Sequence, residues 1–250
     1  MGAPERQSPI PKREQANPLP LEVIRHAAEV PLLGEALSPQ WSRGLLADLF
    51  TESPWTGWHS LRVGLVVNGL LGHYPDLITT SGMDVSAVRA GVLHDNGKVG
   101  NPDISSELLD STDIYDDEQR AKIKTHAPVG AARVAAFDPV AAMIVRTHHG
   151  ITLVDPYPLG IPPRNDIADL RRRDLYRGRV CVAVADVVDA AMSQRPEKGP
   201  AEEALERLND QFGPYITAGN LPLDLLETAV DLRTSDPRIV QLSAPEYMFQ

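Results

Sequence analysis

Two segments of this 250-residue chain are apolar on nearly every face of a helix. Residues 59–71 read HSLRVGLVVNGLL, and residues 179–192 read RVCVAVADVVDAAM. A helix that is apolar all round belongs in a protein core. An isolated carboxylate in such a helix, as at Asp186, is costly unless it is paired or binds a metal. The two segments therefore predict a helical core that contains a buried charged group.

The remaining patterns are also helical, with no alternating strand signal and no internal repeat. Apolar residues recur at helical spacing after Asp84, which we expect to be the N-cap, and this places His94 and Asp95 at the end of a core-facing helix. The acidic cluster at residues 116–118 predicts a helix that begins there and runs toward His126. The chain is expected to be an all-α protein.

Asp138 and Pro139 form an N-cap and N1 pair for a further helix, which we expect to stop at Gly150 with His148 and His149 in its last turn. Residues 151–168 contain four prolines and predict a loop. Beyond Asp186, residues 201–212 and 223–232 show two more amphipathic patterns. The domain organisation predicted from these patterns is a disordered tail at 1–20, an N-terminal helical extension at 21–53 broken at Pro31, Pro39 and Pro54, a helical domain at 54–235, and a C-terminal tail at 236–250.

Composition limits the function. The one cysteine, Cys181, lies in an apolar run and is expected to be a core thiol in a reducing compartment. No apolar run reaches the roughly 18 residues of a membrane span, and the first residues do not resemble a signal peptide, so a cytoplasmic protein without a membrane partner is expected. A net charge of −10 argues against binding nucleic-acid polymers, although bound cations would still allow a phosphate to bind.

The polar residues in the apolar helices are mostly of two kinds, histidine and aspartate. They are His59, His94, Asp95, His126, His148, His149 and Asp186. Any one of these histidines, taken alone, is better explained as a surface residue or a hydrogen-bonded core residue. A metal cluster would account for the set as a whole, because imidazoles and carboxylates suit iron, manganese, zinc or nickel.

Five segments in order resemble the HD-GYP branch of the HD-domain superfamily. They are HSLRV from His59, AGVLHDNGKVGNPD, IKTHAPVGAARV, IVRTHHG and VAVADVVDA, and the resemblance continues to Phe212. It implies an HD-domain helical bundle at 54–235 around two divalent metal ions, with iron or manganese expected and zinc, nickel, magnesium or cobalt possible. By matching motif, His59, His94, Asp95 and Asp186 would bind one ion, and His126, His148 and His149 the other, with Asp95 bridging.

The resemblance also implies a reaction. A hydroxide bridging the two ions would attack a phosphodiester, and Lys98 would neutralise charge on the transition state or assist the leaving oxygen. Lys98, Arg195 and Lys198 match residues that contact substrate phosphate; for Arg195 and Lys198 a solvated loop is an equal alternative, and for Lys98 a solvent-exposed helix end is the weaker one. Arg62 is expected to pair with a carboxylate rather than to bind phosphate.

Four positions depart from the family pattern. In the loop HHGITLVDPYP, Gly150 replaces a glutamate and Pro156 a glycine, although Tyr157 and Pro158 remain. Asn96 stands where the family has a small apolar residue, and either supports the metal ligands or faces solvent. Trp55 stands where members with a third ion have a glutamate, which favours two ions.

The leading hypothesis is a phosphodiesterase that hydrolyses a cyclic dinucleotide, with cyclic di-GMP the substrate that the resemblance implies. Two alternatives stay open. One is a phosphohydrolase acting on mononucleotides, and the other is a degenerate nucleotide-binding or regulatory module. A homo-oligomer is possible.

Overall fold

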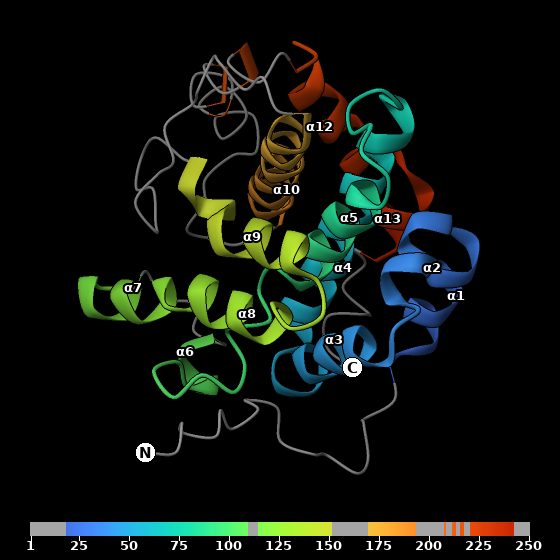
Figure 1. The fold of residues 1–250 in the computed structure, drawn as a ribbon. Coiled ribbons are helices and arrows are strands. Elements are labelled where there is room, and N and C mark those ends of the chain that lie inside the picture. The colour runs from blue at the N-terminus through green and yellow to red at the C-terminus, as the bar shows by residue number, and fades with distance from the viewer. Residues whose placement is uncertain are drawn as a thin grey trace, which may run out of the picture.

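The computed structural model describes residues 19–109, 115–151, 170–193 and 221–242, together with residues 208, 212, 213, 216 and 217. Every regular element among these residues is a helix, so the all-α prediction is confirmed (Figure 1). No helix in these ranges is both long and apolar enough to cross a membrane. The sequence predictions for residues 151–168 and 201–212 fall largely outside the described residues.

Three short helices form the N-terminal extension: α1 (Leu21–Glu29), α2 (Pro31–Leu37) and α3 (Gln40–Glu52). The prolines separate them as predicted, because Pro31 is the first residue of α2, Pro39 precedes α3, and Pro54 begins the next helix. The extension packs against the central helices and buries Leu33, Leu46 and Leu49. It therefore belongs to the same hydrophobic core as the rest of the protein.

The centre of the fold consists of α4 (Pro54–His73), α5 (Met83–Leu93) and α10 (Leu170–Met192), which contact one another (Figure 1). Glycines allow α4 and α5 to approach closely, since a Cβ atom on Gly91 would lie 3.2 Å from the Cα of Gly64. His59 precedes this crossing and His94 follows it. The close approach thus brings the two rings together, with centroids 5.1 Å apart.

The described part of the middle of the chain adds α6 (Ser106–Leu109), α7 (Asp117–Lys124), α8 (His126–Val134), α9 (Pro139–Thr147) and the 3₁₀ helix η1 (His148–Ile151). Asp116 and Gln119 form a capping box at the start of α7, and Asp138 caps α9 by accepting a hydrogen bond of 2.9 Å from the backbone N of Ala141. Both helix starts were predicted.

Two predicted helix boundaries were wrong. The N-cap of α5 is Gly82, whose φ of 78° lies in the left-handed region that favours glycine, and Asp84 lies inside the first turn. The helix that carries the paired histidines ends at Thr147, because the backbone tightens there into η1 instead of continuing to Gly150.

The described C-terminal helices are α12 (Leu225–Ser235) and α13 (Pro237–Gln241). The predicted tail at 236–250 was wrong in its first part, because Asp236 caps α13 and Ile239 and Leu242 are buried. Both helices pack against α4, and α12 also contacts α10. The folded domain therefore extends at least to Leu242.

Candidate metal centre

The fold brings together all seven histidines and aspartates predicted to bind metal. They form three overlapping groups in which the possible ligand atoms lie within 4.8 Å of one another: His126, His148 and His149; His59, His94 and Asp186; and His94, Asp95 and His148. The residues come from α4, the end of α5, the start of α8, η1 and α10. The apolar helices α4 and α10 and the ends of the other elements thus bring polar side chains together in one buried cluster.

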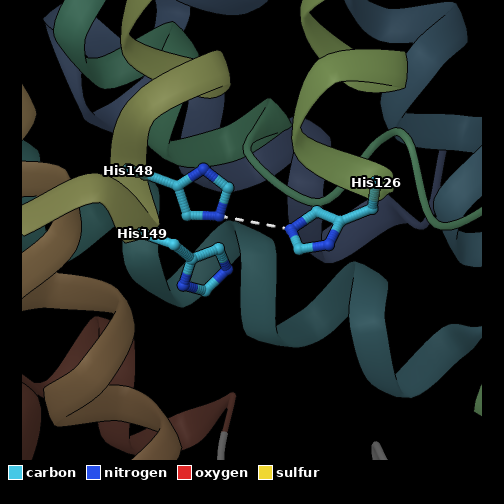
Figure 2. A group of neighbouring side chains, drawn as sticks. All are labelled: His126, His148 and His149. Carbon is cyan, nitrogen blue, oxygen red and sulfur yellow. Dashed lines mark hydrogen bonds between the residues drawn. The ribbon is translucent and has the colours of Figure 1, made fainter. Parts of the chain in front are cut away.

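His126, His148 and His149 form the first group (Figure 2). The Nδ1 atoms of His126 and His148 each lie 2.6 Å from a backbone carbonyl oxygen, those of Ile123 and Val145. A carbonyl oxygen only accepts hydrogen bonds, so each Nδ1 carries the proton and each neutral ring has a lone pair on Nε2. These two Nε2 atoms face each other at 3.3 Å. A cation between them would satisfy both.

Burial keeps this first group neutral at pH 7. Desolvation lowers the pKa of His126 to about 3, although Asp95 raises it in part, and lowers that of His149 to about 4, although Asp186 and Asp95 raise it in part. It also holds the pKa of His148 well below its ordinary value. Neutral imidazoles are the form that binds metal.

His59, His94 and Asp186 form the second group. His94 donates from Nδ1 to the carbonyl oxygen of Gly91 at 2.8 Å. Its Nε2 lies 3.2 Å from the Nε2 of His59, which lies 3.1 Å from Oδ1 of Asp186. Burial opposes a charge on His94, but Asp95 and Asp186 raise its pKa to about 10. The surroundings of this group therefore favour a positive charge.

Asp95 lies between the two groups. Its Oδ1 is 3.3 Å from Nε2 of His126, and its Oδ2 is 3.4 Å from Nε2 of His94. Oδ1 is buried and accepts no hydrogen bond. Burial would raise the pKa of Asp95, but His94 and Lys98 hold it well below its ordinary range. A buried carboxylate with one oxygen toward each histidine group has the geometry of a bridging ligand.

Lys98 is partly buried beside Asp95, with Nζ 2.6 Å from Oδ2. The alternative of a solvent-exposed lysine at a helix end is therefore wrong. Asn96 is fully buried and donates to the carbonyl oxygen of Leu93, so it does not face solvent. Of the other predicted substrate contacts, Arg195 and Lys198 lie outside the described residues, as do Tyr157 and Pro158.

Sequence reasoning missed Asp189. This residue is fully buried on α10, and its Oδ2 lies 2.7 Å from Nδ1 of His59. Arg62 donates to it from Nε at 2.8 Å and from Nη2 at 3.0 Å, so the structural role expected for Arg62 is confirmed. Burial opposes the charge on Asp189, but Arg62 and His59 hold its pKa well below the ordinary value. A signal was available, since Asp189 follows Asp186 by three residues on an apolar helix.

The remaining candidates lie apart from the centre. Cys181 is buried in the core, and desolvation raises the pKa of its thiol to about 12, so it is no nucleophile. His26 lies on α1 and His73 at the end of α4, and neither belongs to a metal-binding group among the described residues. Trp58 is buried in the core.

Comparison with known proteins agrees with this geometry. A cyclic di-GMP phosphodiesterase of Thermotoga maritima is 30% identical over 189 residues, which are 71% of this chain and 47% of the relative. A probable cyclic di-GMP phosphodiesterase of Vibrio cholerae is 30% identical over 220 residues, which are 79% of this chain and 46% of the relative. The chain thus spans about half the length of the curated relatives it matches. No solved structure matches it significantly.

The family model of the HD domain matches residues 56–191. This range covers more than half of the chain, and it contains all seven residues of the three groups. Proteins with this domain are generally metal-dependent phosphohydrolases. With its histidines and aspartates gathered between these limits, the protein belongs to the HD domain family.

Proposed function

We propose that this protein is a metal-dependent phosphodiesterase that hydrolyses a cyclic dinucleotide, with cyclic di-GMP the first candidate. Two divalent ions would occupy the centre. His59, His94 and Asp186 would hold one ion, His126, His148 and His149 the other, and Asp95 would contact both. Iron or manganese suits these nitrogen and oxygen donors, as do zinc, nickel and cobalt, and magnesium less well.

The observation that carries the proposal is the direction of the ring nitrogens. In four histidines, Nδ1 is bonded to an acceptor outside the cluster: Gly91, Ile123, Val145 and Asp189 supply the oxygens. Four Nε2 atoms therefore point inward, in pairs 3.2 Å and 3.3 Å apart. Such pairs repel each other unless a proton or a metal ion lies between them. The presence of two such sets of donors supports the proposal of two ions.

Asp95 and Lys98 have separate tasks in this proposal. Asp95 offers one oxygen to each group and so fixes their spacing. Bound divalent ions would supply the acidity that makes water a nucleophile near neutral pH. Lys98 lies beside the carboxylate at the edge of the cluster, where its ammonium group would stabilise negative charge developing on a phosphate oxygen.

The substrate class rests on the relatives. One relative is named a cyclic di-GMP phosphodiesterase and another a probable one, and the matches cover 71% and 79% of this chain. A net charge of −10 fits a small anionic substrate bound through cations better than a nucleic-acid polymer. The loop from Gly150 to Pro158 departs from the HD-GYP pattern and leaves the substrate pocket undefined, so mononucleotides are tested as the second candidate substrates.

The test is turnover by purified protein loaded with Mn²⁺ or, without oxygen, Fe²⁺. Cyclic di-GMP is the first substrate, and nucleoside mono- and triphosphates form a second panel. We expect linear product from cyclic di-GMP and none with Asp95→Asn. Asp84→Asn, at the other end of α5, is the matched control and should keep wild-type turnover. Hydrolysis of mononucleotides alone would select the second candidate. Absence of turnover with every metal would leave a non-catalytic module.

A further inference from the structure

His59 connects two aspartates of the same helix, one through each ring nitrogen. Its Nε2 lies 3.1 Å from Oδ1 of Asp186, and its Nδ1 lies 2.7 Å from Oδ2 of Asp189. Asp186 belongs to a metal-binding group, whereas Asp189 lies outside the three groups. The ring therefore stands between the candidate metal centre and a second, fully buried carboxylate.

The other histidines with a bonded Nδ1 obtain their acceptor locally. His94, His126 and His148 each bond to the carbonyl oxygen of the residue three positions earlier. This is possible because each lies at the end or the start of a helix, where carbonyl oxygens and turns are available. His59 lies inside α4, where the preceding carbonyls are used by the helix itself. Its acceptor must come from another element.

Asp189 is itself held in place by two guanidinium groups. Arg62 binds both carboxylate oxygens, with distances of 2.8 Å and 3.0 Å, and Arg233 of α12 donates to Oδ1 from Nε. Arg62 also donates to the carbonyl oxygen of Leu242 at 3.1 Å. A two-point contact fixes the rotation of a carboxylate as well as its position. The oxygen that faces His59 therefore has a defined direction.

We infer that Asp189 is a positioning residue that orients His59 and places the Nε2 lone pair toward Asp186 and His94. This inference rests on the proposed metal-dependent function. A carboxylate on the far nitrogen of a metal-binding histidine fixes its tautomer and increases its basicity, and loss of such a partner typically weakens metal binding by about 10–100-fold. Asp189 would act on the ion held by His59, and not on the ion held by His126.

The test is Asp189→Asn, followed by metal affinity with Mn²⁺ and Zn²⁺ in competition with a chelator. We expect two binding steps in the wild type, and in the variant one step weakened about 10–100-fold and the other unchanged. In zinc-loaded protein, ¹⁵N spectra should show His59 losing its strongly hydrogen-bonded Nδ1 proton. These readouts separate positioning from a general loss of stability.

Asp174→Asn is the matched control. Asp174 is also fully buried on α10, but it accepts hydrogen bonds from the backbone of Thr79 at 3.0 Å and of Thr80 at 2.7 Å. This variant should lose stability and keep both metal affinities. The variant Asp189→Asn removes the carboxylate that pairs with the buried Arg233. If it fails to fold for this reason, the double variant Asp189→Asn/Arg233→Gln, which also removes this positive charge, is measured in the same way.

The outcomes distinguish the two proposals. Wild-type protein that binds no divalent ion would contradict the proposed function. Wild-type protein that binds two ions, beside a folded Asp189 variant with both affinities within twofold of wild type, would overturn only the role of Asp189. Equal weakening of both binding steps would also overturn it, because a residue bonded to His59 should affect one ion.

Discussion

Gly97 lies directly against the backbone of His126, so that a Cβ atom on residue 97 would be 2.0 Å from the His126 carbonyl oxygen. It would also lie 2.4 Å from the backbone N of Gly130. The chain after Asp95 thus fits against the first turns of α8 only without a side chain. This contact sets how close His126 comes to Asp95.

Gly97→Ala should therefore push α8 away from the centre. We expect a loss of about 1–3 kcal/mol of stability, as for overpacking. One of the two ions should also bind at least about tenfold more weakly, because His126 moves. Urea denaturation and metal titration test this. Gly72→Ala is the control, since a Cβ atom on residue 72 would meet no neighbouring atom within 4 Å, and it should leave metal binding unchanged.

Removal of metal should destabilise the fold. Without a cation, the Nε2 atoms of His126 and His148 face each other 3.3 Å apart. A ligand at 100 times its dissociation constant stabilises a protein by about 2.7 kcal/mol. Thermal unfolding is measured with Mn²⁺ at this excess and with excess chelator. The free energy of unfolding should be higher with Mn²⁺ by about this amount, and the midpoint temperature should be higher as well. Equal midpoints would contradict a metal site.

The metal-free protein should be most stable near pH 6.5–7. The pKa values of His126, His148 and His149 are lowered, so below pH 6.5 the unfolded chain binds more protons than the folded one, and stability falls as the pH falls. The pKa of His94 is raised to about 10, so above pH 6.5 the folded state retains an extra proton and stability falls as the pH rises.

Urea unfolding of chelator-treated protein measures this dependence. We expect a loss of about 2 kcal/mol or more between pH 6.5 and pH 5. The carboxylates Asp95 and Asp186 have lowered pKa values, and their contribution is lost only below about pH 4. A flat profile from pH 5 to 6.5 would show that the three histidines are not buried in neutral form.

Lys98→Met should reduce turnover by about 10²–10³-fold while both ions remain bound. The reason is that Lys98 contacts Asp95 through its charge, at 2.6 Å, but offers no ligand to a cation. Lys98→Arg should restore part of the rate. A loss of metal from Lys98→Met would instead assign this lysine to the support of Asp95.

Much of the fold follows from local signals. Proline at the first position of α2 and α4, and aspartate before α9, define helix starts through contacts within a few residues. The start of α5 was not found in this way, because Asp84 is of a residue type that commonly caps helices and lies two residues after the actual N-cap, Gly82. The helix α13 carries the same start signal, Asp236 before Pro237, but its five residues are too few to show an apolar period.

The seven clustered residues were predictable because their motifs occur in a family order. The place of Asp189 in the apolar run marks it as a buried carboxylate, but the sequence does not show which groups pair with it. These groups include Arg62 and Arg233, which are 127 and 44 residues away in the sequence. A role that depends on long-range partners is visible only in the folded chain.

The two halves of the centre differ in how far apart in the sequence their Nδ1 acceptors lie. His126, His148 and their carbonyl partners all lie within residues 123–148, so this half requires only the closure of a short loop. The half of the centre that contains His59 forms only when α4, α10 and α12 contact one another, because Asp189 and Arg233 lie on the last two helices. Closing the longer loops between these helices costs more entropy. The half around His126 and His148 is therefore held by contacts of short sequence range, and the half around His59 by contacts of long range.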